Sequence, residues 1–228
     1  MKHSGKAWQT ATRMILFALL GAVGLVAFGW VAFLIGAILK PLTGFLIGTW
    51  LVFSAFALYF FRDPEPIAPS DLKAIVAPAH GTIDVIDEIT EPVVMGGPCR
   101  RISIFLSVFD VHVQNAPVYG KVSYLKHTPG LFLNAMRTDS AEHNENVLVG
   151  FDPVLRPGEK VGVRLIAGLI ARRIVPWIGP EEMIPRSERI GLIRFGSRVE
   201  LYLPLGVKIM AQTGQKVIGG QSILATYE

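Results

Sequence analysis

The sequence predicts an N-terminal α-helical membrane hairpin followed by a mostly β domain of the α+β class. The first 61 residues contain two long apolar runs, and the rest is a succession of short β-branched and apolar segments separated by glycine and proline. The 228 residues are 51% hydrophobic with a mean hydropathy of +0.45, which is too apolar for a purely soluble domain. We therefore expect a membrane anchor at 1–61, a proline-rich linker at 62–71 and a folded domain at 72–228.

The membrane anchor is predicted from length and charge. Residues 14–39 carry no charge, and a second uncharged run follows at 42–61. About 20 apolar residues cross a bilayer as a helix, so the segment from Lys40 to Gly44 is expected to be the turn of a hairpin. A hairpin that only dips into one leaflet is the alternative. Positive charges outside the turn favour both termini in the cytoplasm, namely Lys2, Lys6, Arg13 and Arg62.

The segments of 72–228 predict a sandwich-like β domain. A doubly wound α/β fold would need long amphipathic helices between strands, and only 135–146 could supply even a short one. Segments 75–87 and 209–228 look alike, and the second resembles the hammerhead of biotinyl and lipoyl domains. No lysine stands at the tip where a prosthetic group would be attached, since Lys216 is only loosely similar in placement. A carrier function is therefore disfavoured.

Several classes of site are disfavoured by composition. The single cysteine, Cys99, rules out an intramolecular disulfide framework and a multi-cysteine zinc site. His127 and His143 stand in polar, loop-like surroundings without further ligands at suitable spacing, so they are interpreted as surface residues and no metal is expected. A pI near 9.3 suits nucleic acid as well as lipid, but no nucleic-acid module is present and the apolar runs favour lipid.

A Gly-Ser pair between two apparent strands is the most informative stretch. Gly196 and Ser197 separate the apolar segments 192–195 and 199–203, and glycine tolerates a strained turn. If the Ser197 hydroxyl attacks the Gly196 carbonyl, the amide becomes an ester, and elimination splits the chain. The new terminus would be a dehydroalanine that hydrolyses to a pyruvoyl group. An ordinary Gly-Ser bulge is the alternative, and for an isolated pair it is far commoner.

The surrounding residues resemble a known family. The run GLIRFGSRVELYLP at 191–204, with AGLIARRIV at 167–175, resembles the short bacterial type of phosphatidylserine decarboxylase proenzyme. From Phe60 to the C terminus, further matching motifs follow in the family's order: FFRDPEP at 60–66, APAHG at 77–81, FLSVFDVHVQNAP at 105–117 and GLFLNA at 130–135.

The resemblance implies a complete enzyme mechanism. The chain would cut itself between Gly196 and Ser197 into a β chain of residues 1–196 and an α chain of residues 197–228, which stay together as a heterodimer. A pyruvoyl group would replace Ser197. It would form an imine with phosphatidylserine, whose decarboxylation gives phosphatidylethanolamine. The catalytic domain would face the cytoplasmic side of the inner membrane, and a higher oligomer stays open.

Two histidines are candidates for proton transfer. In SVFDVHVQNAP, strand alternation is expected to place Asp110 and His112 on one face. The resemblance implies that His112 is a proton donor to the carbanion or a base in maturation; a structural histidine is the alternative. In APAHG the family usually has aspartate where this chain has His80. That residue could be the general base itself, or a carboxylate could come from Asp84, Asp87 or Asp110.

Other departures keep rival functions open. Asn115 stands where relatives carry a basic residue or a second histidine, and the segment 144–146 lacks an arginine that is common there. These differences suit a non-enzymatic membrane protein that retains the fold. A pyruvoyl-dependent decarboxylase of a soluble amine is a third hypothesis. The arginines near Ser197 either attract anionic lipid or form a solvated face of mixed charge: Arg172, Arg173, Arg186, Arg189, Arg194 and Arg198.

Overall fold

A single long helix precedes the β domain. The computed structural model describes residues 6–131, 143–168, 173–193 and 197–228. Helix α1 spans Lys6–Phe60, with Pro41 in its interior. Within the described part of the chain, its segment 14–60 is the one helix long and apolar enough to cross a membrane. At about 1.5 Å per residue, these 47 residues extend about 70 Å, which is more than twice the ~30 Å hydrocarbon core of a bilayer.

The hairpin turn predicted at 40–44 is wrong, because all of these residues are helical. A proline removes only one backbone donor, and the other peptide groups keep local hydrogen bonds that need no second segment. The Thr43 hydroxyl also donates to the Leu39 carbonyl at 2.8 Å, so this polar side chain is satisfied along the helix. Apolar runs show where a chain avoids water, but not whether it reverses between them.

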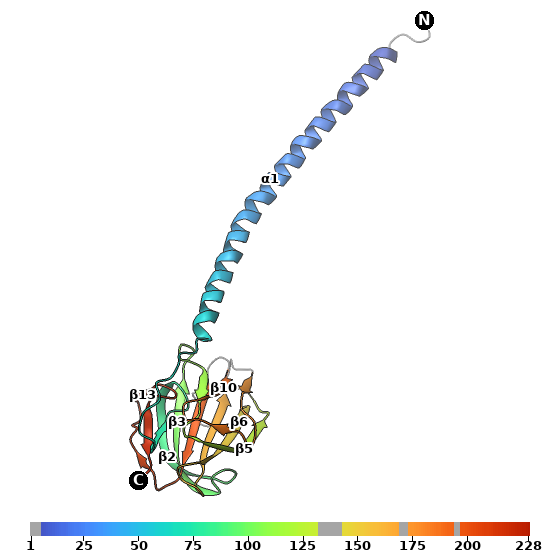
Figure 1. Ribbon diagram of the computed structural model, residues 1–228. Coiled ribbons are helices and arrows are strands. Elements are labelled where there is room, and N and C mark those ends of the chain that lie inside the picture. Colours follow the sequence, from blue (N-terminus) through green and yellow to red (C-terminus); the bar gives the residue numbers. More distant parts are fainter. Residues whose placement is uncertain (1–5, 132–142, 169–172, 194–196) are drawn as a thin grey trace. The chain divides into compact units, whose positions relative to one another are not determined.

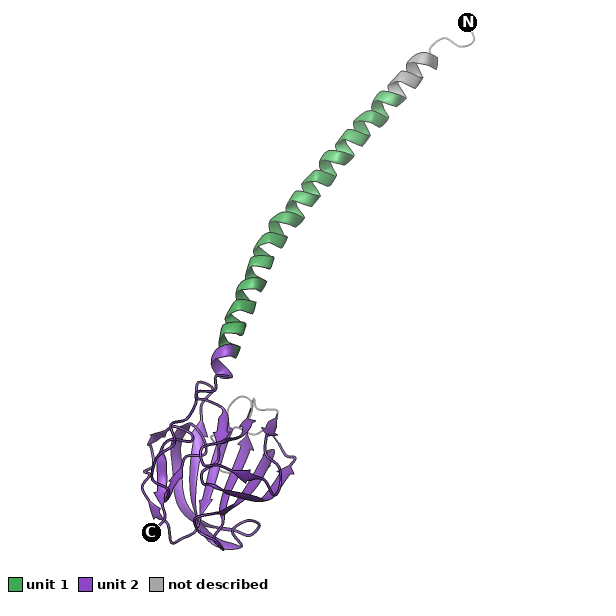
Figure 2. Cartoon of the chain, viewed as in Figure 1, with its two compact units in different colours: residues 1–57 green, residues 58–228 purple. Residues whose placement is uncertain are grey.

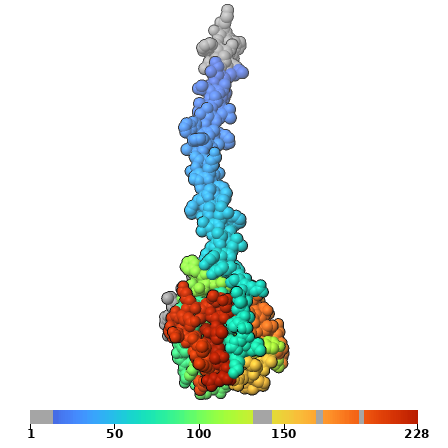
Figure 3. Space-filling model, turned by 60° about the vertical axis from the view of Figure 1, so that its left-hand side comes forward, coloured from blue at the N-terminus to red at the C-terminus, as the bar shows by residue number. Residues whose placement is uncertain are grey.

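The chain divides into two compact units, residues 1–57 and 58–228 (Figure 2). The boundary precedes the expected one at residue 61, because the segment 58–71 contacts the β domain. Arg186 donates to the carbonyls of Pro69 and Ala74 at 2.5 and 2.9 Å. Arg189 pairs with Asp63 at 2.6 Å. On the face drawn in Figure 3, the teal segment that follows the helix lies alongside the red C-terminal segment.

The second unit is built from short strands, and the prediction of a mostly β domain is confirmed (Figure 1). The strands are β1 (Ala74–Val76), β2 (Gly81–Glu91), β3 (Gly97–Leu106), β4 (Val113–Asn115), β5 (Gly120–Thr128), β6 (Asn146–Pro153), β7 (Val161–Ala167), β8 (Ile174–Pro176), β9 (Met183–Ile184), β10 (Arg189–Ile193), β11 (Ser197–Leu203), β12 (Lys208–Ile209), β13 (Lys216–Val217) and β14 (Ile223–Thr226).

Three antiparallel sheets result. The largest has eight strands in the order β13-β2-β3-β11-β7-β6-β5-β9 and is visibly curled (Figure 1). Two three-stranded sheets, β1-β14-β12 and β4-β10-β8, complete the unit. The two segments predicted to look alike are neighbours, since β1 pairs with β14 and β2 with β13. Strand β11 therefore lies inside the largest sheet, with β3 on one side and β7 on the other.

The core lies on one face of β11. Val199, Leu201 and Leu203 are buried in the main hydrophobic cluster, as the two-residue period of a strand dictates. Arg198 and Glu200 point to the other face, where each is only 2% exposed. A strand that is buried on both faces and paired on both edges has little freedom to move. Ser197, the first residue of β11, is therefore held in place.

Candidate active site

Ser197 is the first residue of β11. It lies opposite Leu106 of β3 and Ala167 of β7 in the antiparallel ladders. Its side chain is 0% exposed, and its Oγ has no hydrogen-bond partner among the described residues. A buried hydroxyl without a hydrogen-bond partner lowers the stability of the fold, so its presence indicates a functional role. Gly196, the other half of the predicted cleavage site, lies outside the described residues.

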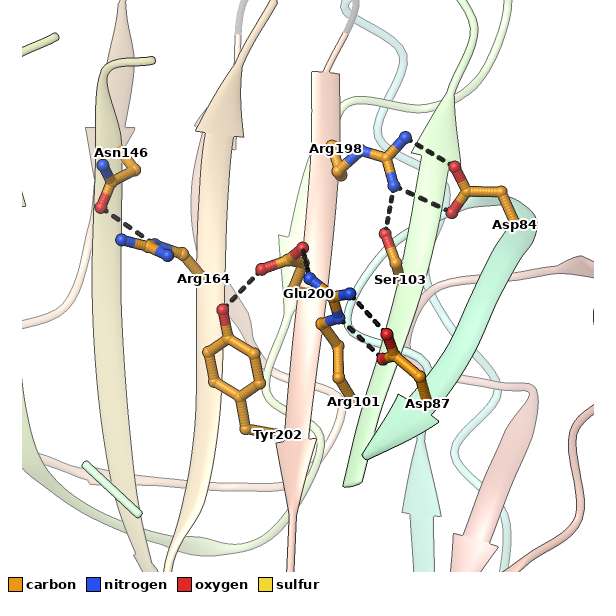
Figure 4. A network of polar contacts seen from close by, with 9 residues as sticks. All are labelled: Asp84, Asp87, Arg101, Ser103, Asn146, Arg164, Arg198, Glu200 and Tyr202. Carbon is orange, nitrogen blue, oxygen red and sulfur yellow. Dashed lines mark hydrogen bonds and ion pairs between the residues drawn. The ribbon is translucent and has the colours of Figure 1, made fainter. Parts of the chain in front are cut away.

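A network of charged side chains fixes β11 on the face opposite the core (Figure 4). Nη1 and Nη2 of Arg198 reach the two carboxylate oxygens of Asp84 at 3.1 and 2.6 Å. Nη1 also donates to Ser103 Oγ at 2.6 Å. Two residues further along β11, the Glu200 carboxylate accepts a hydrogen bond from Arg101 at 3.1 Å. These bonds tie β11 to β2 and β3 through side chains as well as through the backbone.

The same contacts correct the interpretation of the arginines. Arg198 is buried and paired with Asp84, so it cannot face a membrane surface. Arg186 and Arg189 also have partners within the unit. Arg172 and Arg194 lie outside the described residues. Arginine residues in a sequence reveal positive charge but not the group that pairs with it. A buried strand can carry an arginine when a carboxylate lies opposite.

His112 lies in a turn between β3 and β4, so the strand predicted through residues 110 and 112 is wrong. The turn is closed by Asp110, whose carboxylate accepts from the Ser107 backbone N–H at 2.8 Å and from its hydroxyl at 2.7 Å. Asp110 therefore reaches His112 through its main-chain carbonyl, which lies 2.9 Å from Nδ1 of the imidazole. A carbonyl can only accept, so Nδ1 carries the proton and Nε2 has the lone pair.

The His112 ring is 0% exposed. This burial lowers the pKa of His112 to about 4, although the Asp110 carbonyl and carboxylate act in the opposite direction. The imidazole is therefore neutral at pH 7. A neutral ring that carries its lone pair on Nε2 is suited to accept a proton, which is the task of a general base.

Backbone contacts bring the segments of Ser197 and His112 to one end of the largest sheet. Ser197 lies opposite Leu106, and the turn that carries His112 begins directly after Leu106. On the other side, the Ile193 N–H, four residues before Ser197, donates to the His112 carbonyl at 3.2 Å. Ile193 and Ser197, the described residues on either side of 194–196, are thus both held near the turn of His112.

His80 belongs to the same end of the sheet, because Thr82 two residues later pairs with Phe105. Burial lowers the pKa of His80, and Asp110 opposes that shift. Gly81 has φ +148, and a Cβ there would stand 2.3 Å from the Phe105 carbonyl oxygen, so only glycine fits after His80. His80 also contributes to the lowered pKa of His112, as expected for a neighbour.

Asn115, another departure from the family pattern, lies next to His80. A Cβ at Gly219 would stand 2.8 Å from Asn115 Oδ1 and 3.1 Å from His80 Cδ2. The Asn115 amide donates to the Ser187 carbonyl at 2.9 Å. An uncharged amide is suited to this site because its side chain is buried, with the residue 4% exposed.

The three carboxylates considered as partners for a histidine differ in what they bind. Asp84 is engaged by Arg198, and Asp87 by Arg101 at 2.7 Å. Both therefore serve the network on the far face of the sheet. Asp110 is the carboxylate that acts on the two histidines electrostatically.

Metal and thiol chemistry find no support in the part of the chain that the structure describes. There, no group of three or more histidine, cysteine, aspartate or glutamate side chains could hold a metal ion. Cys99 is buried, and burial raises the pKa of its thiol. His127 lies 3.0 Å from Glu145 with half of its side chain exposed.

Sequence reasoning missed two groups of residues. The motif FFRDPEP was noted as a match, but nothing in its letters assigned Phe60 to the surroundings of His112, with which its ring stacks at 4.3 Å. The pairing of the buried Arg198 with Asp84 was also missed. The available signal was alternation along β11, which places residue 198 on the face opposite Val199.

The comparisons with known proteins decide the family. The model of the phosphatidylserine decarboxylase family matches residues 53–225. The chain belongs to the phosphatidylserine decarboxylase family. This confirms the resemblance inferred from the motifs and assigns the chain to a family of lyases.

Curated relatives agree in name. A phosphatidylserine decarboxylase proenzyme of Desulfotalea psychrophila is 46% identical over 175 residues, which cover 77% of this chain and 81% of the relative. The proenzyme of Erythrobacter litoralis is 46% identical over 183 residues, covering 74% and 72%. That of Syntrophus aciditrophicus is 42% identical over 179 residues, covering 78% and 82%. The part of this phosphatidylserine decarboxylase family member that the family model matches, residues 53–225, includes Ser197, His112 and His80.

Proposed function

We propose that this chain is a proenzyme that cuts itself between Gly196 and Ser197 and then converts phosphatidylserine to phosphatidylethanolamine. The observation that carries the proposal is the buried Oγ of Ser197, which has no hydrogen-bond partner among the described residues, at the start of a strand fixed on both edges. The names of the relatives, which include the word proenzyme, support a processing step.

In maturation, Ser197 Oγ attacks the carbonyl carbon of Gly196. His112 accepts the hydroxyl proton at Nε2, in keeping with its neutral ring, and returns it to the nitrogen of residue 197 as the C–N bond breaks, so that the amide becomes an ester with a free amine. Loss of the Cα proton of residue 197 then expels the Gly196 carboxylate and leaves a dehydroalanine. Addition of water and release of ammonia give a pyruvoyl group. His80 is the second candidate for the proton transfers.

The orphaned hydroxyl fits this conversion, since no hydrogen bond within the described residues has to break before Oγ reacts. A pyruvoyl group at position 197 supplies a ketone that draws electrons away when the substrate loses its carboxylate as CO2. The protein then has to hold residue 197, which it does through the ladders of β11. Those ladders also hold the small chain 197–228 to the large chain after the cut, as a heterodimer.

The long apolar helix supports association with the membrane in which the lipid substrate resides. We propose that the β domain lies on the cytoplasmic side of the inner membrane, because Arg62 follows the apolar segment within two residues and a basic residue beside a membrane segment favours the cytoplasmic side. Protease treatment of spheroplasts and of inverted vesicles would test this, and digestion of the β domain in spheroplasts would contradict it.

Denaturing electrophoresis of the purified full-length chain tests the proposed cleavage. The wild type should release a fragment of residues 197–228, whereas Ser197→Ala should stay in one piece. Ser70→Ala, at an exposed linker serine, is the matched control and should be cut like the wild type. A wild type that stays intact would favour a non-enzymatic protein that retains the fold.

The substrate class needs its own experiment. Release of CO2 from phosphatidylserine in vesicles is compared with release from soluble amino acids, using the full chain and a chain that begins at Leu58, the first residue of the second unit. The proposal expects the full chain to act on the lipid and the shorter chain to lose most of that rate. Preference for a soluble amine, unchanged by the truncation, would contradict it.

A further inference from the structure

The last residue of the membrane helix is part of the surroundings of His112. Phe60 is 0% exposed, whereas its neighbours Tyr59 and Phe61 are 47% and 46% exposed. Its ring lies 4.3 Å from the His112 ring between centroids, with an angle of 34° between the planes. Phe60 is therefore turned into the β domain, where it covers one face of the imidazole.

The next residues hold the turn that carries His112. Nη2 of Arg62 donates to the Phe109 carbonyl at 2.6 Å, and the Tyr59 hydroxyl donates to the same oxygen at 3.2 Å. Nη1 of Arg62 donates to the Tyr59 carbonyl at 2.8 Å, and the guanidinium lies 3.9 Å above the Tyr59 ring. These contacts tie Arg62 and Tyr59 to each other and to the middle of the turn at 107–112.

We propose that the last turn of α1 is a positioning element of the active site. Phe60 sets the orientation and burial of the His112 ring, and Arg62 and Tyr59 hold its turn in place. The inference rests on the proposed role of His112 and deepens it. It assigns to the FFR motif at 60–62 the positioning of His112, a function that membrane anchoring alone does not require.

The physical effect of Phe60 is to exclude water from His112. Stacked aromatic rings attract each other beyond the effect of burial, and the charged form of a buried imidazole is disfavoured. The other ionisable groups that face His112 are Asp110, Arg62 and His80, and of these only Asp110 favours the charged form. Without Phe60, we expect the pKa of His112 to rise from about 4 towards the ordinary value of about 6.5.

Continuity of the chain adds a consequence for the substrate. Phe60 ends the apolar segment that begins at residue 14. His112 therefore contacts the residue at which the chain leaves its apolar segment, and the neighbouring Tyr59 and Arg62 are residue types typical of the level of the phospholipid headgroups. A lipid whose tails stay in the bilayer can present its headgroup at that level.

Titration of His112 by NMR tests the positioning without relying on activity. The full-length Ser197→Ala chain, in detergent, carries ¹³C-labelled histidine, and loss of one signal in His112→Asn gives the assignment. Phe60→Leu, and Phe60→Met as a variant closer in volume, should raise the pKa of His112 by one unit or more. Phe53→Leu is the matched control, since Phe53 lies on the same helix with 63% exposure, and it should change nothing. An unchanged pKa in folded Phe60 variants would overturn the inference.

Self-cleavage gives the second readout. Cell-free synthesis of the chain is followed by a shift to pH 5.5 or 7.5, and the rates of cleavage are compared. A base with a pKa of about 4 gives nearly equal rates at both values, whereas one near 6.5 loses about tenfold at pH 5.5. Phe60→Leu should lose rate at pH 5.5 to the extent that its own His112 pKa dictates, up to about tenfold if that pKa reaches 6.5, and Phe53→Leu should not. Equal slowing at both pH values would overturn the inference, whereas absence of cleavage in the wild type would refute the proposed function instead.

Discussion

The pair between Arg198 and Asp84 gives the sharpest prediction for stability. Asp84→Asn keeps the shape of the side chain and removes its charge, so that the guanidinium of Arg198, with 3% of its side chain exposed, loses its carboxylate. Breaking a fully buried pair costs about 3–5 kcal/mol. Asp84 is 33% exposed and Ser103 still accepts from Arg198, so we expect a smaller cost of about 2 kcal/mol.

That cost can be measured by thermal unfolding. For a unit of this size, about 2 kcal/mol corresponds to a fall in Tm of roughly 4–8 °C. Asp152→Asn is the matched control, because its pair with Lys160 is exposed at 42% and 44% and surface pairs contribute about 0–1 kcal/mol. The same Tm for both variants would refute the reasoning.

Cleavage should make the pair more important. In the uncut chain, residue 197 is held from both sides, whereas after the cut it is a chain end that Arg198 anchors at the next position. Asp84→Asn should therefore lower Tm more in the cut wild type than in the Ser197→Ala background. It should also lower kcat for decarboxylation more than the rate of cleavage. Equal losses of Tm in the two backgrounds would contradict this anchoring role.

Three further predictions follow from single residues. The pKa of His112 is about 4 in the folded chain and about 6.5 in the unfolded chain, so the free energy of unfolding falls as the pH drops from 6.5 to 4. Urea unfolding at pH 4.5 should show about 2.5 kcal/mol less stability from this group than at pH 7. His112→Asn should remove that difference. Gly81→Ala should abolish folding, as judged by circular dichroism, because the new Cβ would meet the Phe105 carbonyl, whereas Gly206→Ala has open space and should fold. Lys40 stands 20 residues, or about 30 Å, before the end of α1, so a cysteine there should react with an impermeant maleimide from outside the cell; labelling only after lysis would contradict the orientation.

The β domain could be predicted from sequence because its signals are local. Glycine and proline punctuate short β-branched runs, and the alternation of Val199, Leu201 and Leu203 reveals a strand with one face in the core. A hairpin turn at 40–44 could not be excluded in the same way. A proline between apolar runs suits a reversal and an uninterrupted helix equally well, and the difference lies in hydrogen bonds that leave no mark on composition.

The site was predictable only in part. Ser197, His112 and His80 were found through motifs, and the structure places all three segments at one end of the largest sheet. The strand expected at Asp110 was wrong because its carboxylate closes a turn on Ser107, which alternation cannot reveal. The contact of Phe60 with His112 joins residues 52 positions apart in the sequence, and such a pairing becomes visible only once the chain has folded.

The mass of the small chain tests the central claim most directly. Intact mass spectrometry of the purified wild type should show a fragment of residues 197–228 that is lighter by one NH3 than the same peptide beginning with serine. That mass is expected of a terminus at which the amine has become a ketone. A protein that releases CO2 from phosphatidylserine while Ser197 remains an unmodified residue within a full-length chain would contradict the account.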